Sequence, residues 1–240
     1  MSLAEQVVAW LLDPAHWTGS NGIPVRLAQH LALSLVAVAA AVVLAVPAGV
    51  LIGHTRRGAG LVGALTGAAR AIPTLALVTL FGLALGIGLE APFLTLVILA
   101  IPSCLAGAYA GVRSVDRVTV DAARAIGMSA LQVVTRVELP LAAPVLVGGI
   151  RAATLQVVAT ATLAAYVSDA GLGRYLFAGL KSRDYAQMLG GAVLVAALAL
   201  FVELAFALVQ RALVARAGRE TAARTALPVH LTPTIQKEHS

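Results

Sequence analysis

Two ionisable residues, Arg151 and Glu203, lie deep inside long apolar stretches of this chain. A charge in the middle of a membrane-spanning segment is energetically costly, so such a residue is a candidate for function. Opposite charges on neighbouring helices could form a salt bridge that serves as a hinge or a gate latch. The alternatives are a static pair, or side chains that extend to the membrane surface. The sequence leaves these alternatives open.

A second group of polar side chains lies in the same apolar stretch as Arg151. Hydroxyl and amide groups on one helix could face a polar path. They could also hydrogen-bond to neighbouring helices, an interaction worth about 0.6 kcal/mol in membrane proteins. The group consists of Thr154, Gln156, Thr160 and Thr162.

No residue pattern predicts catalysis or metal binding. The Gly-x-x-x-x-Gly-Lys-Ser/Thr sequence that holds ATP phosphates does not occur, and no Ser/His/Asp or Cys/His set indicates hydrolysis. Cys104 is the single cysteine, which excludes an internal disulfide, and we expect it to be a small buried side chain. We expect His30 and His54, at the ends of predicted spans, to be interfacial. The chain is therefore predicted to be no enzyme and to bind no metal or cofactor itself.

The composition defines the class of protein that positions these residues. Hydrophobic residues make up 60% of the chain and charged residues 12%, and the mean hydropathy is +0.91, far from the average of soluble domains. Apolar windows of about 20 residues recur, each long enough to cross a ~30 Å hydrocarbon core as a helix. No alternating strand pattern occurs, so the predicted fold class is an all-α polytopic membrane protein.

Five spans are predicted, at about residues 29–53, 71–88, 92–112, 145–168 and 187–210, and small residues at 58–70 precede the second span. Pro47, Pro73 and Pro102 each interrupt a span and predict kinks. Abundant glycine and alanine favour close packing of helices and dimer interfaces. Before the spans, Trp10 and Trp17 indicate either a segment at the membrane interface or an amphipathic helix packed on the bundle.

Basic residues set the predicted orientation. In a five-span topology one side carries Arg56, Arg57, Arg113, Arg117, Arg124, Arg136, Arg211, Arg216, Arg219 and Arg224, and the other side only Arg26, Arg174, Lys181 and Arg183. The positive-inside rule then places the N-terminus outside the membrane and the C-terminus in the cytoplasm. The net charge of +6 is explained by these loops and the tail, so we expect no nucleic-acid partner. The predicted organisation is an extracytoplasmic or interfacial segment 1–28, a transmembrane domain 29–212 and a cytoplasmic tail 213–240, disordered from about Leu227.

A polar interlude at residues 114–144 separates the third and fourth spans. Asp121 is predicted to open a short helix, and Gly127 to end it. Ser129 and Gln132 fit a capping box that starts a second helix, and Pro140 is predicted to close that helix. We expect a rigid helical hairpin, held between two membrane spans, that engages another protein.

This interlude resembles the EAA loop of bacterial ABC-importer permeases. The resemblance lies in Asp121-Ala122-Ala123, in Gly127 and in Val137-Glu138-Leu139-Pro140, with aspartate in place of the usual glutamate and valine in place of the usual isoleucine. It implies the type I ABC importer permease fold, with this loop as a cytoplasmic coupling helix that docks on an ATP-binding subunit. The residues it assigns to coupling are Asp121, Ala122, Ala123, Gly127, Leu139 and Pro140.

The resemblance extends over about residues 30–200 and is strongest to the osmoprotectant branch of that family. The segments that carry it include Ala71–Leu77, Arg113–Asp116, Gly149–Thr154 and Ala159–Ala165. It implies import of glycine betaine, choline, carnitine or proline, with Arg151, Thr154, Gln156, Thr160, Thr162 and Glu203 at the translocation path or gate. The glycine-rich turn expected after the fourth span reads Ser168–Gly173 here, which weakens any inference about the solute.

The same resemblance implies partners. We expect cytoplasmic ATP-binding subunits that carry the ATP, a second permease chain that is identical or paralogous, and an extracytoplasmic solute-binding protein. The segment after Gly173 is either a dock for that binding protein, an outer gate or an ordinary loop. One alternative function is import of another small solute such as an amino acid. A secondary transporter or channel is an alternative of another class, but Glu203 is the single acidic residue within a predicted span and the hairpin would be left unexplained.

Overall fold

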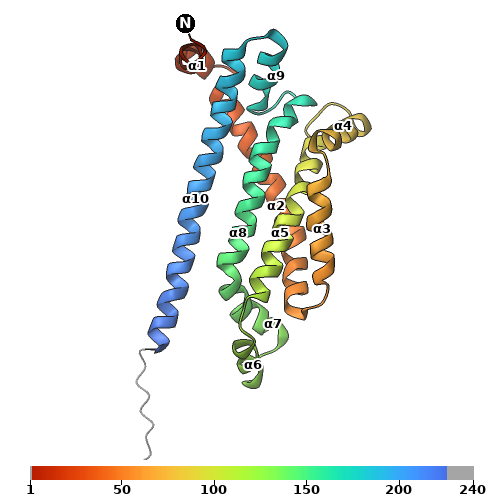
Figure 1. The fold of residues 1–240 in the computed structure, drawn as a ribbon, viewed down its shortest axis with the longest axis vertical. Helices are drawn as coiled ribbons and strands as arrows, with labels where there is room; N and C mark the ends of the chain where they lie inside the picture. The colour runs from red at the N-terminus through yellow and green to blue at the C-terminus, as the bar shows by residue number, and fades with distance from the viewer. Residues whose placement is uncertain (1, 226–240) are drawn as a thin grey trace, which may run out of the picture.

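The computed structural model describes residues 2–225, and every regular element in that range is helical. Four helices are long and apolar enough to cross a membrane, spanning Ile23–Thr55, Glu90–Arg113, Ala130–Tyr166 and Tyr185–Ala215. They run roughly along the long axis of the molecule (Figure 1). The predicted all-α polytopic class is confirmed.

The second predicted span is not one helix. The chain forms α3 (Ala59–Ala71) and α4 (Thr74–Leu85) on either side of Pro73. At 1.5 Å per residue the 13-residue α3 is about 20 Å long, shorter than the hydrocarbon core. Figure 1 shows α3 running beside α5 and α4 turning across one end of the bundle. The chain still passes five times between the two ends, but the second pass is broken at the proline.

The central helix is α5 (Glu90–Arg113), which packs against α2 (Ile23–Thr55) and α8 (Leu139–Thr160). Glycines bring these backbones together. A Cβ at Gly107 would lie 2.6 Å from the Cα of Gly149. A Cβ at Gly49 would lie 2.7 Å from the Cβ of Ala108. The core between the three helices consists largely of Ala, Val and Leu side chains. Close packing through small residues is thus confirmed within the chain.

Of the three prolines predicted to disturb spans, only Pro73 separates two helices. Pro47 lies inside α2 and Pro102 inside α5, and both helices continue through them. Proline is tolerated in membrane helices where packing and nearby groups satisfy the freed carbonyl. The expected interruption at these two positions is therefore not found.

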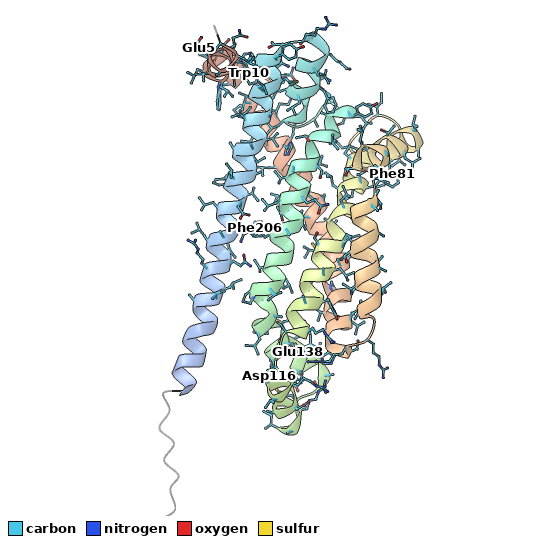
Figure 2. The ribbon with its side chains drawn as sticks, in the orientation of Figure 1. Glu5, Trp10, Phe81, Asp116, Glu138 and Phe206 are labelled. Atoms are coloured by element: carbon cyan, nitrogen blue, oxygen red, sulfur yellow. The ribbon has the colours of Figure 1, made fainter. Side chains whose placement is uncertain are left out.

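The two ends of the bundle differ in construction. One end carries α1 (Leu3–Leu12), α4 and α9 (Gly173–Ser182), and the other carries α6 (Arg117–Ala125) and α7 (Ala130–Val133) (Figure 1). In Figure 2, Trp10 lies at the first end and Asp116 and Glu138 at the second. Trp10 is buried against α10 (Tyr185–Thr225), where a Cβ at Gly190 would lie 2.4 Å from its ring. The packing of this helix on the bundle is thus observed, and its position at the membrane interface stays a prediction. The predicted disorder from about residue 227 falls outside the described residues.

Candidate functional site

The first helix of the hairpin at residues 114–144 begins earlier than predicted. Asp116, not Asp121, is the N-cap of α6, and its carboxylate accepts a hydrogen bond from the Val118 N–H at 3.1 Å. A carboxylate in this position satisfies one of the free N–H groups of the first helical turn. Asp121 therefore lies within α6, with its side chain exposed, and does not open the helix.

The turn of the hairpin is formed as the sequence predicts. Gly127 ends α6 with φ of +86°, in the left-handed region, and the Met128 N–H donates to the Ala123 carbonyl at 3.2 Å, as in a Schellman motif. Ser129 and Gln132 then form the expected capping box, with bonds of 2.8 and 3.4 Å. Two local signals in the sequence thus fix the geometry of the bend.

Pro140 does not close the second helix. The helix that begins at Ala130 passes through a π-helical turn, Val134–Glu138, and continues as α8 beyond Pro140. In this turn the Leu139 N–H bonds to the Val134 carbonyl, one residue farther back than in an α-helix. The change of register at the proline lets the helix continue although Pro140 donates no hydrogen bond. The hairpin is therefore rigidly continuous with the fourth span.

The hairpin has a buried side and an apolar exposed tip. Val120, Ala123 and Val133 are buried in a cluster with residues of α2, α5 and α8. Apolar side chains also point outward from the hairpin: Val118, Ile126 and Leu131 are 73%, 80% and 72% exposed. Exposed apolar residues next to a polar rim are typical of a surface that binds a protein.

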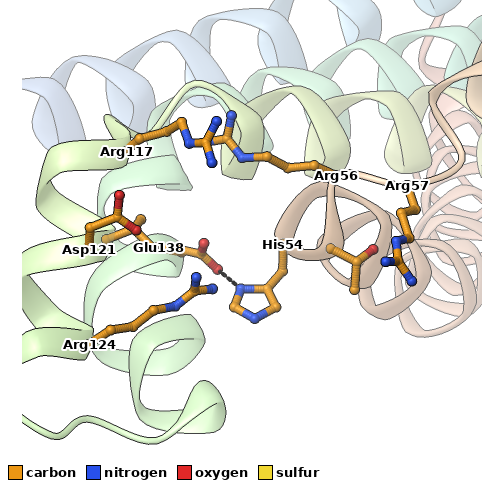
Figure 3. Close-up of a pocket in the computed structure, with 9 residues that line it drawn as sticks. His54, Arg56, Arg57, Arg117, Asp121, Arg124 and Glu138 are labelled. Carbon is orange, nitrogen blue, oxygen red and sulfur yellow. Dashed lines mark hydrogen bonds and ion pairs between the residues drawn. The ribbon is translucent and has the colours of Figure 1, made fainter.

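A side-chain hydrogen bond fastens the base of the hairpin to the first span. The Nδ1 atom of His54 lies 2.7 Å from Oε2 of Glu138 (Figure 3). Both side chains are largely buried, with exposed fractions of 14% and 5%. His54 lies in the last turn of α2, at the end of the span as predicted, and its partner, 84 residues away in the sequence, was not predicted. His30, in contrast, is not interfacial: α2 begins at Ile23, so His30 lies inside it, buried and 2.9 Å from the Val158 carbonyl.

The structure pairs Arg151 with Glu203. The Nε atom of Arg151 donates to Glu203 at 2.8 Å, a second guanidinium nitrogen contacts the other carboxylate oxygen, and Nη1 donates to Gln210 at 2.7 Å. Gln210 in turn donates to the Pro144 carbonyl at 3.1 Å. A bidentate pair has a fixed geometry. This network joins α8 to α10.

The polar residues of the fourth span do not share one environment. Thr154 is buried and its hydroxyl donates to the Ile150 carbonyl of its own helix, and Thr160 and Thr162 likewise bond to carbonyls within the helix at 2.7 and 2.8 Å. Gln156 is exposed and accepts a hydrogen bond from Ser103 of α5 at 3.5 Å. Of the four, Gln156 is the one that presents an exposed polar group beside a second helix.

The opposite end of the bundle carries a second charged network. Buried Arg26 of α2 contacts the carboxylate of Asp169 at 3.3 Å, and Arg174 contacts the same carboxylate at 2.8 Å. The Gly171 N–H donates to Gln29 at 3.1 Å. These bonds tie the turn at Ser168–Gly173 to α2. The segment after this turn is the helix α9.

Tyr175 of α9 adds a further contact to this end. Its hydroxyl donates to the Asn21 carbonyl at 2.7 Å. Burial raises the pKa of Tyr175, and the positive charge of Arg26 offsets part of that rise. The hydroxyl therefore remains a protonated donor at neutral pH.

The apolar tip and the pair formed by His54 and Glu138 differ in how far the sequence predicts them. The apolar tip has a sequence signal, namely large apolar residues inside a polar interlude. The pair formed by His54 and Glu138 has none, because nothing local relates the two positions. Among the described residues no group of three or more His, Cys, Asp and Glu side chains could hold a metal ion.

Four helices long enough to cross a membrane, glycine-mediated packing and an ordered hairpin at one end define a polytopic membrane protein. The chain belongs to the family of binding-protein-dependent transport system inner membrane components, whose model matches residues 25–219. It is 35% identical over 185 residues to the choline transport system permease protein OpuBB of Bacillus subtilis (strain 168), covering 77% of this chain and 85% of the relative. It is 31% identical over 194 residues to the glycine betaine/carnitine/choline transport system permease protein OpuCB of the same organism, covering 81% and 89%.

Solved structures show the same fold. The chain is similar to the MetNI methionine ABC transporter in inward-facing conformations, with 26% sequence identity and a TM-score of 0.67 over 77% of this chain and 93% of the other. The type I ABC importer permease fold is thereby confirmed, as is the resemblance to the osmoprotectant permeases.

Proposed function

We propose that this chain is the transmembrane permease subunit of an ATP-driven importer of compatible solutes such as glycine betaine, choline, carnitine or proline. The observation that carries this proposal is the 31–35% identity to permeases named for choline, carnitine and glycine betaine, over more than three quarters of the chain. Because the family is that of permease components of transport systems, we assign ATP hydrolysis to a separate subunit.

The hairpin is the proposed contact with that ATP-binding subunit. Its apolar tip (Val118, Ile126 and Leu131) suits a groove on another protein, as in helix-in-groove recognition. Its base is continuous with α8 and bonded to α2 through Glu138 and His54. A displacement of the tip would therefore move two spans together. Ala123, Gly127 and Leu139 shape the hairpin, whereas Asp121, Ala122 and Pro140 are exposed on its surface.

The translocation path is proposed to form between two permease chains. So few spans are expected to need a second chain to build a path, and Gln156, exposed and bonded to Ser103 of α5, offers a polar group for it. The Arg151–Glu203 pair would latch α8 to α10 in one state of the gate. Thr154, buried by its own bundle, would support α8 from inside, and Thr160 and Thr162 are half-buried.

The orientation follows from the basic residues. The end with the hairpin carries Arg56, Arg57, Arg117 and Arg124, and we place it in the cytoplasm of a multi-pass plasma-membrane protein. The opposite end, with α9 and the Asp169 network, would then face the extracytoplasmic solute-binding protein. The N-terminus would lie outside and the C-terminus inside.

An amino-acid importer is the second candidate function. It is favoured by the similarity to the methionine transporter MetNI. Uptake by cells that lack their own osmolyte importers, and that express this chain with its neighbouring transport genes, separates the two. We expect uptake of labelled glycine betaine, choline or carnitine that excess methionine does not reduce. Uptake of methionine with none of the quaternary ammonium solutes would refute the first candidate.

A further inference from the structure

A cavity of about 360 Å³ lies between the end of α2 and the hairpin. It is lined by His54, Thr55, Arg56, Arg57, Arg117, Val120, Asp121, Arg124 and Glu138. Figure 3 shows the side chains of Arg117 and Arg56 extending toward one another across one side of the cavity, with Arg124 on the other side, near the His54–Glu138 pair. The cavity thus joins two elements that the proposed coupling movement would involve.

The charges around this cavity are not balanced. Four arginines face two carboxylates, which leaves a surplus of two positive charges when His54 is neutral. Glu138 is already bonded to His54. None of the four arginine side chains has a hydrogen bond or ion pair to any described residue. Guanidinium groups that outnumber the carboxylates around them attract an anion.

The position of the cavity indicates which anion is available. Arg56 and Arg57 follow directly on the last turn of a membrane-spanning helix, which ends at Thr55. Basic residues at this level meet the phosphate groups of lipid heads, and the planar guanidinium group matches phosphate oxygens with two parallel hydrogen bonds. The volume is within the range of small-ligand sites.

We propose that this cavity binds a phosphate group, and that the bound phosphate bridges the end of α2 to α6. An anionic phospholipid head and a free phosphate compound share this chemistry. The bridge would neutralise Arg56 and Arg117 together and would hold the hairpin at a fixed angle to the first span. The site is separate from the apolar tip and from the path residues.

Native mass spectrometry of the purified full-length chain, titrated with phosphatidylglycerol, tests this site. We expect binding to weaken about fivefold for each arginine removed in Arg56→Gln and Arg117→Gln, and about 25-fold in the double variant. The double variant with lysine at both positions keeps the charge but not the paired hydrogen bonds, so its affinity should lie between those of the wild type and the double glutamine variant. Arg183→Gln is the matched control, because Arg183 also ends a helix with positive φ (58°, against 56° at Arg56) but lies in α9's C-cap at the other end.

Two further titrations identify the source of the phosphate. Displacement of phosphatidylglycerol by inorganic phosphate supports a site that accepts soluble phosphate, whereas no displacement supports a site for a lipid head. In the second titration, phosphatidylcholine should bind more weakly than phosphatidylglycerol. Circular dichroism and gel filtration confirm that the variants are folded. Equal binding by the wild type and the folded double variant would overturn the proposal. The proposal would also be overturned if the double variant bound phosphate as the wild type does but no longer co-purified with the ATP-binding subunit. The arginines would then bind acidic side chains of that subunit.

Discussion

Glu138 and His54 are 84 residues apart in the sequence, yet their side chains meet at 2.7 Å at the base of the hairpin. The bond connects the π-helical turn before α8 to the last two turns of α2. Both side chains are largely buried, so the bond holds the two elements together at their base. The hairpin and the first span are therefore expected to move as one body.

Removal of this bond should loosen the hairpin. Glu138→Ala leaves the His54 ring without its partner in a mostly buried place, at a cost of about 1–3 kcal/mol. Glu138→Gln keeps an acceptor and should cost less. Thermal unfolding of the purified variants measures the difference. A Glu138→Ala chain as stable as the wild type would show that the bond does not contribute to the stability of the fold.

The Arg151–Glu203 pair is expected to be exchangeable. Arg151→Glu or Glu203→Arg alone places two like charges together within the membrane and should lower both yield and transport. The double variant restores opposite charges at the same distance and should recover a large part of both. Gln210→Ala, which removes only a neighbouring bond, should have a smaller effect than either single change. Failure of the double variant to improve on the single variants would argue against a functional pair.

The contact between Gly107 and Gly149 should tolerate no side chain. A valine at Gly107 would meet the α8 backbone, and overpacking of this kind costs about 1–3 kcal/mol. Gly63→Ala in α3 is the matched control, since a Cβ there has no atom within 4 Å and alanine favours a helix. Melting temperatures should fall for Gly107→Val and stay level or rise for Gly63→Ala. The reverse order would mean that α5 and α8 are not in close contact.

The apolar tip should matter for coupling and not for folding. Ile126→Asp and Leu131→Asp place charges at positions that are exposed in the chain, so thermal stability should change by less than about 0.5 kcal/mol. In a complex with the ATP-binding subunit, the same charges would enter an apolar contact. We expect solute-stimulated ATP hydrolysis to fall at least tenfold. Leu83→Asp, exposed on α4 at the other end, should leave the ATPase subunit attached.

Local signals in the sequence predicted much of the fold. The apolar windows gave the four long spans, and Gly127 with the Ser129 box gave the bend of the hairpin, because each depends on neighbours in sequence. The errors lie where tertiary context decides. Pro140 continues a helix because a π-turn changes the register, and α2 and α5 continue through Pro47 and Pro102 whereas the second pass breaks at Pro73.

The candidate site was predictable to a lesser degree. Arg151 and Glu203 stand out as charges in apolar stretches, so their pairing could be raised as a hypothesis. His54 with Glu138, and Arg26 with Asp169, join positions whose separation carries no period or motif. Thr154 and Gln156 are two residues apart on one helix, and only packing against the other spans separates the buried residue from the exposed one.

The central claim is that solute import through this chain is driven by ATP on a partner subunit coupled through the hairpin. The most direct measurement is uptake of labelled glycine betaine into proteoliposomes that contain this permease, its ATP-binding partner and its binding protein, with ATP enclosed on the hairpin side. We predict uptake that requires both ATP and the partner, and that is lost in Ile126→Asp. Uptake that persists without the ATP-binding subunit, or that follows an ion gradient alone, would contradict the account.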